Sequence, residues 1–325
     1  MSAPLLQVDD LRVHFRVDDG LLKAVDGVSY ELGQGETLGI VGESGSGKTV
    51  SSLAVIGLLE RPPAEIPSGR IIFGDEDLLT YSENRMSDVR GRRISMIFQE
   101  PMTSLNPVMA IGLQISEVVR RHLGMSKRQA RERTLELLNL VGIPEPSKRI
   151  DEYPHQLSGG MRQRVMIALA LACEPMILIA DEPTTALDVT IQAQILELMA
   201  SLQEKLGTSI LLITHDLAVI AETAHRVAVM YAGRIVEKAP VKEIFQNPRH
   251  PYTQGLLRSI PRIDREREKR LTEIPGFVPS LADLPSGCAF VDRCPQAIDR
   301  CRRDTPMIEA ISEGHQVSCW RAEDG

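Results

Sequence analysis

The stretch GESGSGKT runs from Gly42 to Thr49 and decides the fold of this 325-residue chain. It follows the short apolar run Glu36–Val41, which predicts a buried strand. The residues after it, 48–59, predict a helix that the prolines at 62 and 63 stop. A strand, a glycine-rich loop and a helix in this order are typical of a phosphate-binding loop. The chain is therefore expected to contain an α/β nucleotide-binding domain.

Each residue type in this loop suits the binding of a nucleoside triphosphate. Glycines allow successive backbone N–H groups to turn inward around the β-phosphate, and the following helix adds its positive end. Lys48 supplies a charge for the β- and γ-phosphates, and the Thr49 hydroxyl is placed for Mg²⁺. The remaining residues expected in the cradle are Gly42, Glu43, Ser44, Gly45, Ser46 and Gly47.

A second apolar strand, in the stretch MILIADE at Met176–Glu182, ends in two carboxylates. Asp181 is expected to hold Mg²⁺ through water, and Glu182 to polarise the water that attacks the γ-phosphate. The alternative is that the two acids only cap the edge of a sheet. Gln99 ends the apolar run ISMIF, and its amide can contact both Mg²⁺ and water.

The stretch LSGGMRQR at Leu157–Arg164 lies about 110 positions after the phosphate loop. Ser158 is a suitable N-cap for a helix that continues to Ala172, and Gly159 and Gly160 expose N–H groups at its start. This is a second anion site in a chain that already has one. We expect it to serve the ATP bound by a partner subunit, and the alternative is a capped helix with no ligand.

The pattern of elements predicts an inserted helical part and a separate C-terminal extension. Further strands are expected at 5–15, 25–32, 94–98, 209–214 and 226–231, with the first two at sheet edges. Residues 111–123 and 127–140 carry apolar residues at helical spacing. We therefore predict an ATPase domain at residues 1–238, a helical subdomain at about 100–160, and an extension at 239–325. The charged run at 264–270 is expected to be a solvated face or linker, with lipid headgroup contact as the alternative.

Composition excludes several classes of protein. The formal net charge of −7 argues against a protein that binds nucleic acid by neutralising phosphates. The most apolar stretch, 165–180, is broken by Glu174 and Pro175, so it predicts a buried helix followed by a strand. It falls short of the roughly 20 uninterrupted apolar residues that a membrane-spanning helix needs. The acidic N-terminus is also unlike a signal peptide.

Four of the five cysteines gather near the C-terminus, at Cys288, Cys294, Cys301 and Cys319. Four clustered thiols can hold a tetrahedral zinc ion or an iron–sulfur cluster, or remain free. The spacing lacks the C-x2-C pairs of zinc ribbons and bacterial ferredoxins, so the residues alone leave these alternatives open. Cys173 ends an apolar stretch and is expected in the core.

The phosphate loop, QEP, LSGGM and ILIADEPTTALD, in this order, resemble the nucleotide-binding subunit of an ABC transporter. Three C-terminal stretches narrow the resemblance: NPRHPYTQGLL at 247–257, IPG at 274–276 and GCAFVDRCP at 287–295. They resemble the extension of peptide-importer ATPases, the dipeptide, oligopeptide and nickel uptake subunits. The resemblance covers nearly the whole chain.

The resemblance implies a P-loop NTPase fold of the ABC type and an ATPase that powers import of di- or oligopeptides. The implied partners are a second, homologous ATPase subunit in a heterodimer, two membrane permeases and an extracytoplasmic substrate-binding protein, with no nucleic acid. The implied location is peripheral, on the cytoplasmic face of the inner membrane. Alternatives are the same role for nickel, glutathione or another small solute, or a soluble ABC ATPase acting on nucleic acid or ribosomes.

The resemblance also assigns roles to single residues. His215, after the strand SILLIT, would contact the γ-phosphate, and residues 186–188 would cross the dimer seam. Phe15 is the candidate for stacking on adenine, with a core phenylalanine as the competing interpretation, while Tyr30 stands too close to the phosphate loop. A permease helix would enter near residues 99–107. The four C-terminal cysteines would hold a structural [4Fe-4S] cluster, with zinc as the alternative.

Overall fold

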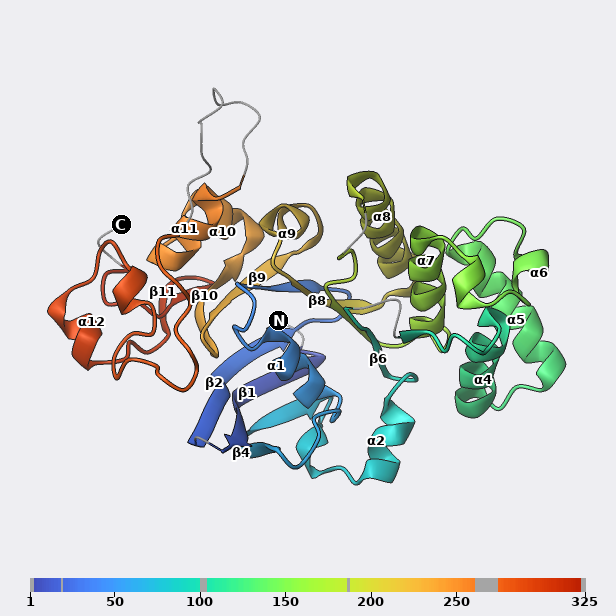
Figure 1. Ribbon diagram of the computed structural model, residues 1–325, viewed down its shortest axis with the longest axis horizontal. Helices are drawn as coiled ribbons and strands as arrows, with labels where there is room; N and C mark the ends of the chain where they lie inside the picture. The colour runs from blue at the N-terminus through green and yellow to red at the C-terminus, as the bar shows by residue number, and fades with distance from the viewer. Residues whose placement is uncertain (1–2, 19, 100–103, 186–187, 261–273, 323–325) are drawn as a thin grey trace. The chain divides into compact units, whose positions relative to one another are not determined.

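The structure is a computed structural model that describes residues 3–18, 20–99, 104–185, 188–260 and 274–322 (Figure 1). The chain divides into two compact units. Unit 1 contains residues 1–32, 37–79 and 213–325, and unit 2 contains residues 33–36 and 80–212. Each unit combines strands with helices, which confirms the predicted α/β class.

The first sheet of unit 1 is antiparallel and has the order β2-β1-β4-β5. The strand predicted at 25–32 is part of β2, which is an edge strand as expected. The strand predicted at 5–15 is present but is not an edge strand, because β1 pairs with β2 on one side and β4 on the other. Pro67 and Gly69 interrupt the apolar pattern of β4, so the sequence did not predict this strand, which pairs with β1. The elements are β1 (Leu6–Val17), β2 (Gly20–Leu32), β4 (Ala64–Phe73), β5 (Glu76–Asp77) and the 3-10 helix η1 (Leu78–Thr80).

The second sheet contributes five strands to unit 1, in the order β11-β12-β10-β9-β3. They are β3 (Thr37–Val41), β9 (Arg226–Tyr231), β10 (Arg234–Pro240), β11 (Glu309–Ser312) and β12 (His315–Val317). β3 and β9 are parallel and almost entirely buried, as the apolar runs predicted. β10 runs through the domain boundary predicted near residue 238, and unit 1 continues on both sides of it. The division into two domains at that point stays a prediction.

The helices of unit 1 are short. They are α1 (Lys48–Val55), α9 (Leu217–Thr223), α10 (Val241–Gln246), α11 (Pro251–Arg258), η3 (Val291–Arg293) and α12 (Asp299–Arg303). The helix predicted at 48–59 ends at Val55, four residues early. Gly57 adopts a φ of 62°, a left-handed conformation that ends helices, so the chain turns before the prolines are reached.

Unit 2 contains the strand order β8-β7-β6 and the longest helices that the structure describes. The strands are β6 (Ile94–Ile97), β7 (Ile177–Asp181) and β8 (Ser209–Thr214), whose last two residues belong to unit 1. The helical elements are α2 (Glu83–Val89), α4 (Ile111–Leu123), α5 (Lys127–Leu140), α6 (Pro146–Arg149), η2 (Pro154–Gln156), α7 (Gly159–Ala170) and α8 (Val189–Leu206).

Two helices of unit 2 match their predictions closely, whereas the bounds of the helical subdomain stay a prediction. α4 and α5 have the predicted bounds, and both pack against α7 (Figure 1). α7 ends at Ala170, two residues before the predicted end, and β7 follows it. The buried helix and strand expected from the apolar stretch 165–180 are therefore both present.

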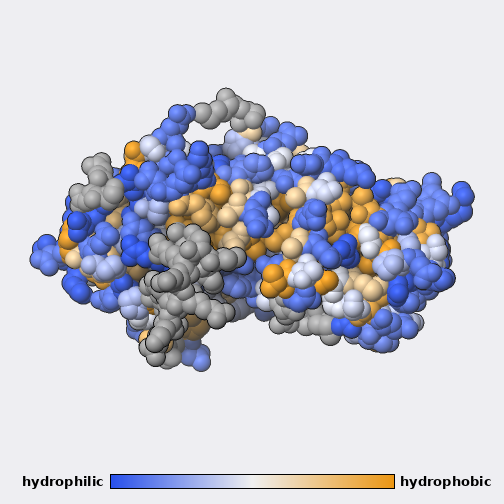
Figure 2. All heavy atoms as spheres, turned by 90° about the horizontal axis from the view of Figure 1, so that it is seen from above, coloured by the Kyte–Doolittle hydropathy of each residue, from blue (hydrophilic) through white to orange (hydrophobic). Residues whose placement is uncertain are grey.

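Polar and charged residues cover much of the face shown in Figure 2, with hydrophobic residues exposed between them. Within the ranges that the structure describes, no helix combines the length and the apolar character needed to span a bilayer. The predicted charged linker at 264–270 lies outside the described residues, as do residues 100–103 of the expected permease groove and residues 186–187 of the expected seam loop.

Candidate active site

The loop after β3 closes tightly on the backbone of unit 1, and two glycines make this possible. A Cβ on Gly42 would lie 2.1 Å from the carbonyl oxygen of Met230. A Cβ on Gly47 would lie 2.2 Å from the carbonyl oxygen of Ala24, and Gly47 also has a φ of 97°. Any side chain at these positions would collide with backbone atoms, so the cradle depends on both glycines.

Lys48 lies inside the loop and begins α1. Its ammonium group is buried and donates hydrogen bonds to the carbonyl oxygens of Gly42 (2.7 Å) and Glu43 (3.0 Å). A positive charge and the first amides of a helix therefore share the loop, an arrangement suited to an anion with several phosphates. Thr49 is the next residue and is exposed, so its hydroxyl is accessible to a ligand.

Glu43 has partners in the C-terminal part of unit 1 that the sequence did not indicate. Its carboxylate accepts two hydrogen bonds from the Arg293 guanidinium, at 2.7 and 3.1 Å. Its backbone amide donates to the hydroxyl of Tyr252, at 2.9 Å. Both partners lie in stretches quoted above for the resemblance, at 247–257 and 287–295, but no local pattern connects them to the loop.

The two predicted carboxylates lie at the end of β7 in unit 2. All five residues of β7 are buried, and Asp181 is its last residue. Glu182 follows in a left-handed conformation with a φ of 46°. Its Oε2 atom accepts hydrogen bonds from the Gln99 side-chain amide (3.0 Å) and the Thr185 hydroxyl (2.9 Å). Gln99 was predicted at this site, whereas Thr185 was missed although the stretch DEPTT contains it.

The LSGGMRQR stretch forms the start of α7, also in unit 2. Ser158 is the N-cap, as predicted, and its hydroxyl accepts a hydrogen bond from the Met161 amide at 3.3 Å. Ser158 and Gly159 are exposed, and Gly160 is partly exposed. The helix start is therefore open to an anion. Gln163 of the same stretch donates to the Pro183 carbonyl, which connects α7 to the segment after Glu182.

The remaining candidates lie in unit 1. His215 is exposed and directly follows β8. Phe15 is half-buried in β1, opposite Leu22 of β2. Tyr30 is buried and its hydroxyl lies 3.4 Å from that of Ser51, so it cannot stack on a ligand. The structure thus brings Gln99 and Glu182 together in unit 2, and it places the phosphate loop, Phe15 and His215 in unit 1.

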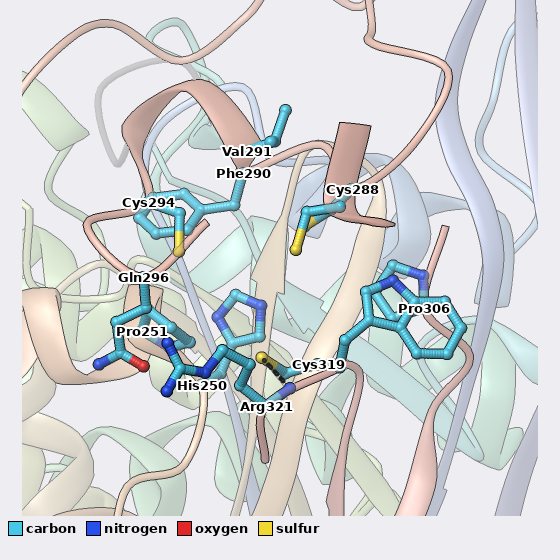
Figure 3. Close-up of a pocket in the computed structure, with 12 residues that line it drawn as sticks. His250, Pro251, Cys288, Phe290, Val291, Cys294, Gln296, Pro306, Cys319 and Arg321 are labelled. Carbon is cyan, nitrogen blue, oxygen red and sulfur yellow. Dashed lines mark hydrogen bonds between the residues drawn. The ribbon is translucent and has the colours of Figure 1, made fainter. Parts of the chain in front are cut away.

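The four C-terminal cysteines line one small cavity of about 10 Å³, together with His250, Phe290 and Trp320. The sulfur atoms of Cys288, Cys294 and Cys319 turn toward a shared space (Figure 3). Burial raises the pKa of Cys288 to about 11, so its thiol is protonated at neutral pH when no cation is bound. Among the described residues, no group of three or more His, Cys, Asp or Glu side chains has the arrangement of a metal site. Cys173 is buried elsewhere, as predicted.

Backbone amides donate to three of these sulfurs. The amide of Arg321 lies 3.4 Å from the Cys319 sulfur, and the amides of Phe290 and Gln296 bond to Cys288 and Cys294 in the same way. In each pair the donor is two residues after the cysteine. Such bonds favour the thiolate over the thiol, because they stabilise negative charge on sulfur.

Comparison with known proteins identifies the two parts of the chain. Residues 25–185 match the ABC transporter family, and residues 236–301 match the family described as the oligopeptide/dipeptide transporter, C-terminal region. The ATP-binding cassette of a dimer in a post-hydrolysis state, bound to ADP and phosphate, has a similar structure. Its TM-score is 0.65 at 26% identity, and the match covers 73% of this chain and 98% of the cassette.

Two similar relatives match along nearly their whole length. The dipeptide transport ATP-binding protein of Escherichia coli is 53% identical over 97% of this chain and 96% of the relative. The oligopeptide transport ATP-binding protein of Bacillus subtilis is 54% identical over 97% of this chain and 88% of the relative. The chain is therefore an ABC-type ATPase and belongs to the family of ABC transporter ATP-binding proteins with the oligopeptide/dipeptide transporter C-terminal region.

Proposed function

We propose that this chain hydrolyses ATP to drive the import of di- and oligopeptides through a membrane transporter. The observation that carries the substrate class is the identity of 53–54%, over 97% of the chain, to ATP-binding proteins named for dipeptide and oligopeptide transport. The match of residues 236–301 supports the same class. Nickel and glutathione, the alternatives left by the sequence, are named by neither of these relatives.

In this proposal, residues 42–49 bind the phosphates of ATP. The buried Lys48 ammonium meets the β- and γ-phosphates, and the backbone amides of the loop enclose them. Thr49, Gln99 and Asp181 supply a hydroxyl, an amide and a carboxylate oxygen, the donor types that Mg²⁺ prefers. Bound there, Mg²⁺ would neutralise phosphate charge. Phe15 remains the candidate for adenine stacking.

Hydrolysis is assigned to Glu182. Its carboxylate accepts hydrogen bonds from Gln99 and Thr185 through Oε2, and these bonds would hold it in position to polarise a water molecule. His215 is assigned to the γ-phosphate, where it would help to set the position of that water.

Ser158, Gly159 and Gly160 are assigned to the ATP of a partner subunit. These residues are exposed or partly exposed at the N-terminus of α7, where backbone N–H groups can bind an anion, which supports a ligand supplied from outside the chain. We propose a heterodimer with a second, homologous ATPase, in which Asp188, the N-cap of α8, lies near the seam. The dimer would bind two membrane permeases at the cytoplasmic face of the membrane, with an extracytoplasmic protein delivering peptide.

Copurification with a variant that traps ATP tests this assembly. Glu182→Gln should bind ATP normally and hydrolyse almost none, because the amide cannot polarise water as a carboxylate does. Purified from membranes in mild detergent with ATP and Mg²⁺, it should bring two hydrophobic permeases and a second ATPase. Uptake of labelled dipeptide should fail in cells that carry this variant. Normal ATP turnover by the variant would refute the assignment of Glu182, and recovery of ribosomal or DNA-repair proteins alone would refute the transporter.

We also propose that Cys288, Cys294, Cys301 and Cys319 hold a [4Fe-4S] cluster. The donor set fits, because four thiols line one cavity and three of their sulfurs accept backbone hydrogen bonds. Binding would deprotonate the thiols, and it would require the sulfurs to move apart, because a cavity of about 10 Å³ has room for no more than a water molecule. The cluster's assigned role is structural.

Metal analysis of protein purified without oxygen tests the cluster. We expect about four iron atoms and four acid-labile sulfides per chain, from the composition of the cluster. Cys294→Ser should lose both, whereas Cys173→Ser, a buried cysteine outside the cavity, should retain them. Stoichiometric zinc without sulfide would refute the cluster and favour the zinc alternative.

A further inference from the structure

The three C-terminal stretches that distinguish this family meet at the phosphate loop. Tyr252 belongs to residues 247–257, and its hydroxyl accepts from the Glu43 amide. Arg293 belongs to residues 287–295, and its guanidinium pairs with the Glu43 carboxylate. In the third stretch, 274–276, the backbone carbonyl oxygens of Ile274 and Pro275 accept hydrogen bonds from Arg293. All of these contacts lie within unit 1.

Every N–H of the Arg293 guanidinium has an acceptor. Two bonds reach the Glu43 carboxylate, one from each terminal nitrogen. The other three reach the carbonyl oxygens of Pro275 (3.1 Å) and Ile274 (3.3 Å) and the hydroxyl of Tyr231 (3.5 Å). Arginine has five such donors in a rigid fork, so the site matches this side chain and no other.

The ion pair is enclosed rather than solvated. The Arg293 side chain is 5% exposed and that of Glu43 is 31% exposed. The rings of Tyr231, Tyr252 and Phe290 pack against one another beside it, with centroids 4.6 to 5.4 Å apart. Burial by itself lowers the pKa of Arg293, but the hydrogen bonds that Arg293 donates to Glu43 and Tyr231 outweigh it, so the charge is retained. An ion pair in such surroundings is less screened by solvent than a surface ion pair, so its two side chains keep a more fixed geometry.

We infer that Arg293 and Tyr252 are positioning residues for ATP binding, which hold the phosphate loop in its nucleotide-ready conformation through Glu43. This inference rests on the proposed role of residues 42–49. Glu43 connects the two parts, because its carbonyl oxygen also accepts from the Lys48 ammonium. The C-terminal region thus fixes, through one residue, the position of the charge assigned to the phosphates.

Arg293 has a second effect on the loop, through charge. Without it, the Glu43 carboxylate would stand unneutralised one residue from Gly42, where the phosphates of ATP are expected. Two negative groups in a partly enclosed site repel one another strongly. Loss of Arg293 should therefore weaken ATP binding more than loss of the Glu43 charge does.

Equilibrium ATP binding by the full-length protein tests the inference. Arg293→Met should raise the Kd for ATP about tenfold, as expected for a lost charge-assisted hydrogen bond pair. The value of kcat at saturating ATP should change little, because no group assigned to hydrolysis is altered. Arg293→Lys should restore little, since lysine lacks the fork. The matched control is Arg302→Met, which removes an exposed ion pair with Asp292 in the same region and should leave Kd unchanged.

Further variants separate positioning from general damage to the fold. Glu43→Gln combined with Arg293→Met should bind ATP no more weakly than Arg293→Met alone, because the two residues act as one unit. Tyr252→Phe keeps the ring but removes the acceptor for the Glu43 amide, and it should raise Kd even if Arg293→Met fails to fold. Additive losses in the double variant, with each variant folded, would overturn the inference.

Lys48→Ala distinguishes failure of this inference from failure of the proposed site. If Lys48→Ala abolishes ATP binding while Arg293→Met and Tyr252→Phe bind ATP normally, the positioning role of Arg293 and Tyr252 is refuted and the phosphate site stands. If Lys48→Ala also binds normally, the phosphate site itself is misassigned, and the inference fails with it.

Discussion

At the scale of single residues, the orientation of Glu182 is the feature on which the proposed chemistry depends. Its backbone is left-handed, a conformation that costs free energy for a residue with a side chain. Thr185 and Gln99 hold its carboxylate through the same oxygen. The strained backbone and the two hydrogen bonds together fix where the other oxygen points. A general base needs such positioning more than it needs affinity for the substrate.

Removing the Thr185 hydroxyl should slow hydrolysis without weakening ATP binding. Thr185→Val has nearly the same shape but cannot donate to Glu182, so we expect kcat to fall about tenfold. The Kd for ATP should stay within twofold, by the same assignment of roles. Thr185→Ser keeps the donor and should retain most of the activity. A valine variant with normal kcat would show that the Thr185 hydroxyl does not position the carboxylate.

At the scale of elements, two helices of unit 2 each begin at a serine N-cap but are assigned different roles. Ser126 caps α5 and accepts from the Gln129 amide at 3.4 Å. Ser158 caps α7 and accepts from the Met161 amide at 3.3 Å. Both serines are exposed. The two helices therefore share the same serine cap bond, while α5 has an additional bond from the Ser126 hydroxyl to the Gln129 side chain (2.7 Å). A ligand contact is proposed only for Ser158.

Replacing either capping serine by alanine should lower the free energy of unfolding by a similar amount, but only the replacement of Ser158 should affect function. We expect Ser126→Ala and Ser158→Ala each to lower the free energy of unfolding by about 1 kcal/mol, measured by urea denaturation. Only Ser158→Ala should also lower the ATPase rate of the assembled transporter. Equal ATPase rates in the two variants would mean that the start of α7 is a structural cap and does not contact nucleotide.

At the scale of the whole molecule, unit 1 is built from segments that are far apart in the sequence. Glu237 of β10 is fully buried and accepts hydrogen bonds from the amides of Arg249 (2.8 Å) and His250 (2.9 Å), before α11. It also lies 2.7 Å from the Nε2 atom of His315 in β12. Burial alone raises the pKa of Glu237, but these hydrogen bonds outweigh it, so its pKa lies below the usual value.

Glu237→Gln should destabilise unit 1 in a pH-dependent way. An amide has one accepting oxygen where the carboxylate has two, so it cannot satisfy all of these donors, and we expect a loss of about 3 kcal/mol in the free energy of unfolding at pH 7. Because the folded pKa is lowered, the carboxylate's contribution is fully present above about pH 4.5 and is lost as pH falls through the folded value. The gap between wild type and variant should therefore narrow below pH 4.5. The exposed Glu313→Gln is the control and should change stability by less than about 0.5 kcal/mol.

Much of the site could be predicted because its chemistry is local in the sequence. The phosphate loop needs glycines, Lys48 and Thr49 within eight residues, and the two carboxylates follow directly from a buried strand. α4 and α5 were predicted to the residue because the apolar spacing that indicates them lies within the helices themselves. Errors came where local signals were weak. β4 lacks a clean alternation, so its pairing with β1 was missed, and Gly57 ended α1 early.

The sequence by itself determined the family, the nucleotide-binding loop and the nearness of four cysteines along the chain, since each of these depends on residue types at short spacing. Only the tertiary structure decided what Glu43 contacts. Tyr252 and Arg293 lie 209 and 250 residues further along the chain. Their meeting depends on which surfaces bury one another when β9, α11 and η3 pack together. No periodicity or cap encodes a contact over that separation, because its free energy comes from burial and charge pairing in the folded unit.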